Sequence, residues 1–281
     1  MKFLSSFSFV VSIAVIAGFI VGEIPYGNEI ATIALIIAMT LSISNIPFKL
    51  SDFDRKKVAF AVIINYVFLS SIILIFSMLF YRSEFFNGMI VMAAAPPAVA
   101  VLPLTKIAGG NERLSLFALI LSYILAIFIM PALIYIFLAK FVSIFDLLKS
   151  VALLILLPML LSRFIKLESS NEIINAFFFF VIFPIIGANR RLFFVDAKLL
   201  IFLSILMAIR TIGSGSMIKY ITKKKFGVKN AISYSMFAAF KNEGLVMILA
   251  SSLFTPSAAI PAIIATIFEL VWVAMVEANL I

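Results

Sequence analysis

The residues best suited to chemistry in this sequence are charged and lie inside apolar segments. Lys241, Asn242 and Glu243 interrupt one such segment, and Arg210 and Glu269 lie within two others. A charge at the centre of a bilayer costs roughly 2.5–3.5 kcal/mol on insertion scales, so it needs a partner or a function. We therefore expect these five residues to bind a substrate or an ion, or to form buried ion pairs.

Lys241 allows two interpretations. In the first, its ammonium lines a transport path, where it binds an anionic substrate or exchanges a proton. In the second, it neutralises Glu243, Glu269 or the carbonyl end of a broken helix as part of a structural ion pair. The functional interpretation is favoured, because charge inside a membrane is functional by default, and the two are compatible. For Arg210 and Glu269, structural and functional roles are equally supported.

The composition is that of an integral membrane protein. Of 281 residues, 64% are apolar and 12% charged, and the mean hydropathy is +1.24, whereas about a quarter of the residues in a soluble domain are charged. The sequence has no cysteine and no histidine, which excludes disulfides and zinc sites built on these residues. Nothing pairs a nucleophile with a base or cradles a phosphate. We expect no enzyme activity, no cofactor and no metal.

Ten apolar segments approach the length of about 20 residues that a helical span requires. We expect an all-α membrane protein with ten transmembrane helices in a single transporter domain, residues 1–281. The expected helices cover residues 3–21, 29–44, 58–80, 88–108 and 114–139 in the first half, and 147–161, 172–187, 198–218, 231–254 and 258–278 in the second.

The basic residues predict the orientation. Most of the 22 lysines and arginines fall in alternate connections between the apolar segments, and cytoplasmic loops are enriched in these residues. We therefore expect a multi-pass protein of the cell membrane with both termini in the cytoplasm. The net charge of +9 then reflects topology and contact with lipid rather than a nucleic-acid partner; the sequence specifies no protein partner. Five spans per half predict two inverted repeats, residues 1–140 and 141–281.

Prolines and polar residues predict breaks in the fourth and ninth helices. Pro96 and Pro97 interrupt the fourth apolar segment and Pro103 interrupts it again, while Gly244 follows the charged residues of the ninth. Proline removes a backbone donor and clashes with the preceding turn, so a helix bends or breaks there. Interrupted spans in matching positions of two repeats indicate a transporter's binding site.

Other polar residues have predicted roles near these breaks. Asn242 or Glu243 is expected to cap the second half of the ninth helix. Asn65 in the third span and Ser115 in the fifth either line a cavity or bond a neighbouring helix.

Two groups of motifs resemble the bile acid:sodium symporter family. The motifs are residues 94–97, 109–111 and 114–116 in the first half, and residues 241–245 and 257–262 in the second. The resemblance covers most of the chain but is specific only around the fourth, fifth, ninth and tenth spans. It implies ten spans in two inverted repeats, with the fourth and ninth helices crossing at their breaks. Members of the family move organic anions, often together with sodium.

The sequence departs from this family at the sodium ligands. In sodium-coupled members a Ser-Asn pair follows the break of the fourth helix, and Val101 and Leu102 stand there. Phe237 stands where the family has a glutamate that bridges two sodium sites, and Lys241 replaces a glutamine one turn later. A fixed ammonium thus occupies the place of a mobile cation.

These departures lead to a functional prediction. Asn65 and Ser115 fall on positions that carry polar sodium ligands in the family, but a hard cation needs several oxygen ligands and most are missing. We expect a secondary transporter of a small or amphipathic organic anion that works by alternating access without sodium, with Lys241 replacing the bound cation. The alternatives are a proton-linked or cation exchanger that uses Lys241 with Glu243 or Glu269, and a non-transporting membrane sensor.

Overall fold

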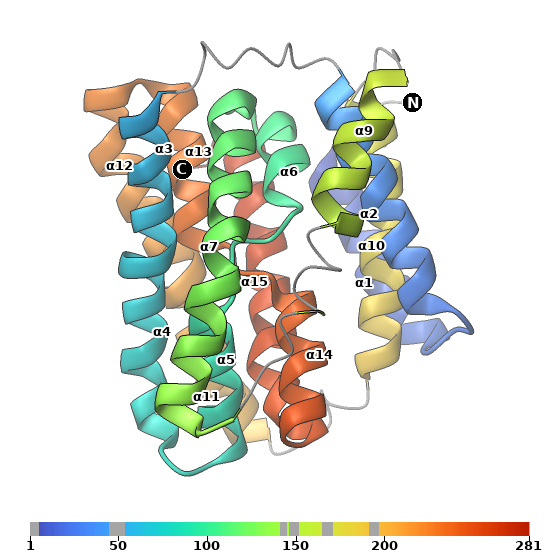
Figure 1. Ribbon diagram of the computed structural model, residues 1–281. Coiled ribbons are helices and arrows are strands. Elements are labelled where there is room, and N and C mark those ends of the chain that lie inside the picture. The colour runs from blue at the N-terminus through green and yellow to red at the C-terminus, as the bar shows by residue number, and fades with distance from the viewer. Residues whose placement is uncertain are drawn as a thin grey trace.

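The computed structural model describes residues 6–44, 54–140, 145, 152–164, 171–190 and 197–280, and every regular element in these ranges is a helix (Figure 1). The first half contains α1 (Phe7–Val21), α2 (Gly27–Ser44), α3 (Arg55–Ile63), η2 (Ile64–Leu69), α4 (Ser70–Ser77), η3 (Met78–Phe80), α5 (Glu84–Ala94), α6 (Val101–Ile107) and α7 (Glu112–Leu138). The second half contains η4 (Ala152–Leu156), α9 (Leu157–Phe164), α10 (Asn171–Asn189), α11 (Ala197–Ala208), η6 (Ile209–Gly213), α12 (Ser214–Phe226), α13 (Val228–Ala239), α14 (Glu243–Leu253), η7 (Pro256–Ala259) and α15 (Ile260–Glu277).

Several helices begin at polar residues that cap them. The side chains of Asp54, Ser83 and Asn111 accept hydrogen bonds from the backbone at the starts of α3, α5 and α7, which satisfies donors that have no partner within the helix. Lys57 bonds the Asp54 carboxylate and holds its pKa below the usual range. These residues set where each helix begins.

Four helical stretches are long and apolar enough to cross a membrane, and shorter apolar helices accompany them. The long stretches are Arg55–Phe80, Glu112–Leu138, Lys198–Phe226 and Ser257–Glu277. The all-helical architecture expected from the sequence is thereby confirmed for the described residues, and these apolar stretches support a membrane-embedded protein, while the ten spans and the inverted repeat stay predictions. The third stretch extends beyond the predicted residues 198–218, because the lysine-rich segment that follows continues as helix α12. The start of the predicted segment 147–161 lies outside the described residues.

Two short interruptions lie within apolar stretches of the chain. Pro96 and Pro97 lie between the end of α5 and the start of α6, and the second interruption is Phe240–Asn242, between α13 and α14. Two predictions differ from the structure. Pro103 lies in the first turn of α6, where a missing N–H leaves no bond unmade, so it does not interrupt the helix. Gly244 lies inside α14 rather than at the break.

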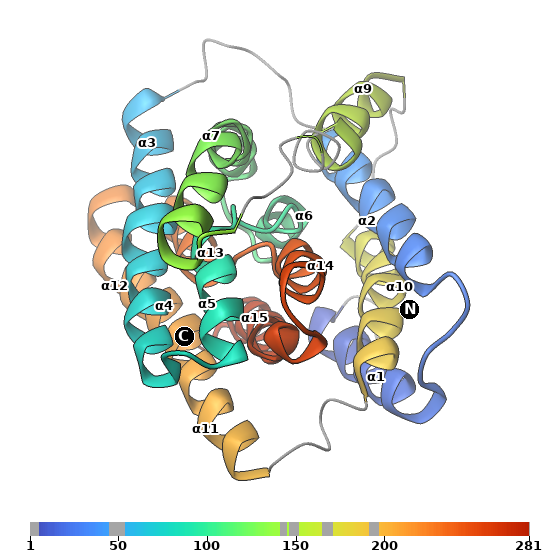
Figure 2. The same cartoon turned by 60° about the horizontal axis from the view of Figure 1, so that its bottom comes forward.

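The helices form two groups. Helices α1, α2, α9 and α10 pack on one another, and we call them the four-helix group; η4 packs on α2 and α9 beside it, and the remaining helices form the larger group (Figure 2). The four-helix group meets the larger group mainly through α6 and α15. Residues of both breaks, Ala98 and Lys241, line one pocket together with Leu35 of α2 and Phe178 of α10, so the breaks lie at the boundary between the two groups.

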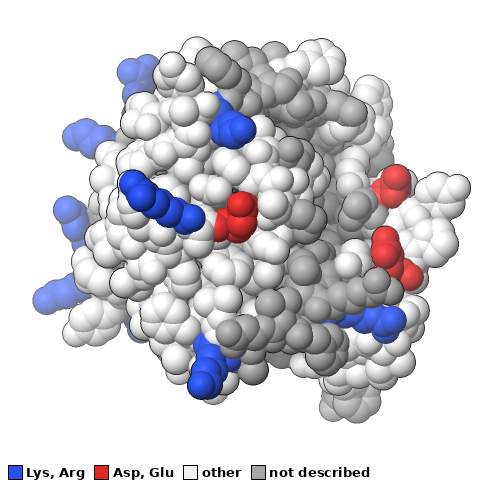
Figure 3. Space-filling view, turned by 90° about the horizontal axis from the view of Figure 1, so that it is seen from below, with Lys and Arg blue, Asp and Glu red and all other residues white. Residues whose placement is uncertain are grey.

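The ends of the helices are consistent with the predicted orientation, which stays a prediction. The start of α3 and the end of α12, both rich in lysine and arginine, lie at the same end of the molecule (Figure 1). At the opposite end, charged side chains of the described residues are few and dispersed (Figure 3).

Gly88 is required by the packing of α5 against η7. A Cβ at this position would overlap the backbone carbonyl of Ala258, which cannot move aside as a flexible side chain could. We expect Gly88→Ala to lower the free energy of unfolding by roughly 1–3 kcal/mol, the usual cost of overpacking. Thermal unfolding in detergent measures this. Gly213→Ala is the control, because a Cβ there meets only Ile209 Cγ2 at 3.8 Å; equal losses in both variants would contradict the assigned contact.

Candidate functional site

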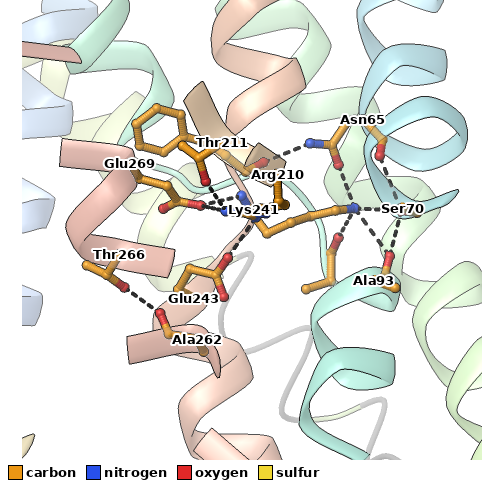
Figure 4. Close-up of polar contacts among 12 residues, drawn as sticks. Asn65, Ser70, Ala93, Arg210, Thr211, Lys241, Glu243, Ala262, Thr266 and Glu269 are labelled. Carbon is orange, nitrogen blue, oxygen red and sulfur yellow. Dashed lines mark hydrogen bonds and ion pairs between the residues drawn. The ribbon is translucent and has the colours of Figure 1, made fainter. Parts of the chain in front are cut away.

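The ammonium of Lys241 is enclosed by four oxygen atoms, which we call the oxygen cage (Figure 4). Lys241 Nζ lies 2.9 Å from Asn65 Oδ1, 2.9 Å from Ser70 Oγ, 2.8 Å from the Ala95 carbonyl and 3.3 Å from the Ala93 carbonyl. The lysine is fully buried, with 0% of its surface exposed. An ammonium has three hydrogens and no acceptor, so this cage satisfies all of its donors with neutral oxygens.

The break between α5 and α6 creates the cage. The last carbonyls of a helix have no partner within it and carry the negative end of the helix dipole. The α5 carbonyls cannot be satisfied by Pro96 and Pro97, which have no N–H. Ser70 Oγ donates to the Ala93 carbonyl at 2.6 Å, and the lysine supplies the remaining donors. The ring of Tyr66 lies 4.8 Å from Lys241 Nζ and adds an aromatic face.

Asn65 joins the cage to the other break. Its amide Nδ2 donates to the carbonyls of Phe237 at 2.9 Å and Phe240 at 2.8 Å, at the end of α13, while its Oδ1 accepts from Lys241. The two breaks also touch directly, because the Asn242 N–H donates to the Pro96 carbonyl at 2.7 Å. The polar residues thus hold the two interrupted segments together.

Two π-helical segments present side chains to the site. Asn65 and Tyr66 belong to η2, within the long stretch before α5, and Arg210 and Thr211 belong to η6, within the stretch before α13. A π-helical turn contains an extra residue and commonly occurs at functional sites. Each π segment lies in the helix that precedes an interrupted segment, so the two occur in matching places of the two halves.

Arg210 binds both carboxylates of the site. Its Nη2 lies 2.8 Å from Glu243 Oε1, and its Nη1 lies 2.8 Å from Glu269 Oε1 and 3.0 Å from Thr211 Oγ1. Glu269 Oε1 also accepts from the backbone N–H of Lys241 at 3.1 Å. Arg210, Glu243 and Glu269 are 0%, 3% and 4% exposed. Glu243 is the first residue of α14, where the helix dipole favours a negative charge.

The formal charges of the site cancel. Arg210 and Lys241 contribute two positive charges, and Glu243 and Glu269 contribute two negative ones. In a low-dielectric interior a net charge is costly, whereas a balanced and hydrogen-bonded set is tolerated. Two atoms of this set stand apart: Glu243 Oε2 and Arg210 Nε are buried and have no hydrogen-bond partner among the described residues.

A cavity of about 130 Å³ lies between the four-helix group and the breaks. Its wall on the α2 and α10 side is apolar and includes Leu35, Phe178 and Ile182. The opposite wall contains the polar residues Lys241, Asn242, Glu243, Thr266 and Glu269. The cavity is smaller than the roughly 300–1,000 Å³ typical of drug-sized ligand pockets, so it suits a small molecule with one polar and one apolar end.

Asn242 and Gly244 shape the polar wall of this cavity. Asn242 caps α14 through Oδ1, which accepts from the Leu245 N–H at 3.1 Å, and its Nδ2 donates to the Tyr123 hydroxyl at 2.6 Å. The predicted capping role thus falls to Asn242 rather than Glu243. Gly244 leaves space, since a Cβ there would meet only Asn242 Oδ1, at 3.7 Å.

The structure brings most of the predicted site residues together and separates one. Asn65, Arg210, Lys241, Asn242, Glu243 and Glu269 form one connected set around the breaks. Ser115 lies elsewhere: its Oγ is 3.1 Å from Thr105 Oγ1, in a contact between α7 and α6. Ser115 therefore joins two helices, which is one of the two roles that the sequence allowed.

Ser70 and the α5 carbonyls were not foreseen from the sequence. Ser70 follows Asn65 by five residues, and in a regular α-helix residues at this spacing point in different directions. The π-helical turn of η2 brings them together, and Ser70 Oγ approaches the Asn65 carbonyl at 3.2 Å. The backbone carbonyls of the cage carry no signature in the sequence other than the prolines that follow them.

The sodium-ligand positions named above offer few side-chain oxygens. The side chains of Val101, Leu102 and Phe237 are buried and apolar, and the Phe237 carbonyl is bonded by Asn65. Within the described residues, no group of three or more acidic side chains is present that could hold a metal ion.

Comparison with known proteins identifies the family. No curated protein matches the chain. A family model does match, over residues 8–178, more than half of the chain, and this range includes Asn65, Ser70 and the prolines of the first break. The match agrees with the bile acid:sodium symporter-like motifs of the sequence. The chain therefore belongs to the SBF-like CPA transporter family of membrane transporters.

Proposed function

We propose that this protein is a secondary transporter of a small organic anion that does not use sodium. The observation that carries the proposal is the oxygen cage, in which a lysine ammonium occupies a site suited to a cation. Sodium would require several of these oxygens as ligands. Because Lys241 already bonds all four, and because the chain itself supplies this cation, ion binding from solution is unnecessary to hold the breaks together.

The cavity beside the breaks is the proposed substrate site. Its apolar wall suits a hydrocarbon tail, and its polar wall includes the first turn of α14. The N-terminus of a helix favours an anionic group, because its N–H groups and dipole point toward it. The small volume favours a short carboxylate over a sterol conjugate.

Alternating access is the proposed transport mechanism. The cavity lies at the boundary between the four-helix group and the larger group, so a rocking motion of one group against the other would open it to either side of the membrane in turn. The matching positions of the two breaks and of the two π-helical segments support an inverted repeat of residues 1–140 and 141–281, the arrangement that allows such motion.

The experiment that tests this function is a thermal-shift screen of the purified protein. Short carboxylates and sterol conjugates are each added in sodium chloride and in choline chloride. We expect short carboxylates to raise the melting temperature equally in both salts, because ligand that binds only the folded state stabilises it. Stabilisation that requires sodium would contradict the proposal.

Counterflow separates a transporter from a sensor. If the chain transports its ligand, labelled carboxylate should accumulate transiently in proteoliposomes loaded with unlabelled carboxylate. Binding without counterflow would favour a non-transporting membrane sensor instead.

A further inference from the structure

The free carboxylate oxygen of Glu243 bears on the question of which ion accompanies the substrate. Glu243 Oε1 is occupied by Arg210, but Oε2 has no partner among the described residues, although the side chain is only 3% exposed. Glu243 also lines the cavity. A buried acceptor without a donor is costly, so this oxygen is suited to a group that brings a hydrogen.

The charge balance of the site also favours a ligand that brings a hydrogen. The positive charges of Arg210 and Lys241 are already offset by Glu243 and Glu269, so the site has no surplus positive charge for an anion. An anion that entered alone would leave one net negative charge in a buried site within the membrane, which is unfavourable. The oxygen cage holds the lysine, so the compensating cation must bind elsewhere.

We propose that the substrate is a short monocarboxylate with an apolar tail, and that it enters together with one proton held between its carboxylate and Glu243 Oε2. This inference rests on the proposed transport function and names its coupling ion. The proton comes from water and returns to water on the other side, and no covalent bond other than the O–H is made or broken. One anion and one proton cross together, so transport is electroneutral.

Glu243 is the carboxylate that can take this proton, because the other polar groups around it already have hydrogen-bond partners. Arg210 of η6 binds one oxygen of Glu243 and one oxygen of Glu269, and the Lys241 N–H adds a second bond to Glu269. From α7, the Tyr123 hydroxyl is occupied by Asn242. The cavity residues that α2 and α10 contribute are apolar.

Proton movement in proteoliposomes tests this inference. The probe is 4-methyl-2-oxopentanoate, a branched monocarboxylate, added outside vesicles that contain a pH-sensitive dye. In the wild-type protein we expect internal acidification with one proton per labelled anion and no dependence of the flux on membrane potential. The apparent affinity should fall about tenfold per unit of rising pH where Glu243 is ionised, because one proton binds with the anion.

Glu243→Gln isolates the role of the carboxylate. Its amide keeps an oxygen for Arg210 and supplies a permanent N–H toward the cavity, so the variant should still bind the probe, with an affinity that no longer depends on pH. Coupled acidification should be lost. Glu29→Gln, which removes an exposed carboxylate, is the matched control and should behave as the wild type.

The outcomes distinguish the two proposals. Probe flux in the wild type without acidification, or with acidification that survives in Glu243→Gln, would overturn the proton inference and leave the transport function standing. If other carboxylates bind but the probe does not, the inferred substrate class is wrong. If no carboxylate binds or moves at any pH, the transport proposal itself fails. The wild-type proton measurement decides the coupling even if the variant does not fold.

Discussion

Replacing Lys241 with glutamine is expected to abolish sodium-independent transport and to make thermal stability depend on sodium. The variant loses one positive charge and removes the lysine's bonds to the carbonyls of Ala93 and Ala95, of which only the Ala93 carbonyl keeps another donor among the described residues, Ser70 Oγ. Breaking a buried charge set by removing one partner costs roughly 3–5 kcal/mol. The emptied cage keeps the oxygens of Asn65 and Ser70 and gains an amide oxygen, so a hard cation can replace the ammonium.

The measurement is the melting temperature of the variant in increasing sodium chloride, compared with choline chloride. We expect a rise with sodium in Lys241→Gln and none in the wild type. Lys241→Met is the matched control, since it removes the same charge but adds no oxygen, and its sodium response should be weaker. A Lys241→Gln protein that is as stable as the wild type and transports normally would show that the ammonium has no role in the site.

Replacing Arg210 is expected to destabilise the protein by a comparable amount, because Glu243 and Glu269 lose the positive charge that binds both of them. Arg210→Gln leaves Glu243 and Glu269 facing each other with only Lys241 to offset them, and Arg210 is fully buried at 0% exposed. We expect a loss of roughly 3–5 kcal/mol in the free energy of unfolding. By contrast, Lys57→Ala breaks the exposed pair with Asp54 and should leave the free energy of unfolding almost unchanged, because solvent screens such a pair.

A double variant tests whether charge balance is the cause. Arg210→Gln with Glu269→Gln restores a net charge of zero, so it should recover a substantial part of the stability lost in Arg210→Gln. Comparing each single variant with the double variant gives the coupling energy between the two positions. If the free energy of unfolding falls in the double variant by the sum of its decreases in the two single variants, the residues do not interact and the assigned ion pair is wrong.

The sequence was sufficient to predict an all-helical chain and the location of the breaks, whereas the ten spans stay a prediction. Long apolar segments specify spans by length alone, and Pro96 and Pro97 specify the first break because proline cannot continue a helix. The second break carries a weaker signal, and the sequence predicts it at Gly244, a residue that is helical in the structure. The cause is Asn242, which caps α14 one residue before Glu243 and so places Gly244 in the first turn.

The pairing within the site could not be predicted from the sequence. Lys241 and Glu243 are close in the chain, which suggested a pair, yet the ammonium bonds neutral oxygens and Arg210 takes both carboxylates. The direction in which the long Lys241 side chain points depends on where the α5 carbonyls lie in three dimensions, and the sequence does not specify this. The π-helical turn that adds Ser70 likewise depends on packing rather than on a local motif.

The central claim is that the ammonium of Lys241 takes the place of a mobile cation. Counterflow of a labelled carboxylate identified in the thermal-shift screen tests this claim most directly, with choline replacing sodium on both sides of the proteoliposome membrane. We predict the same initial rate in both salts. A flux that appears only when sodium is present would contradict the account.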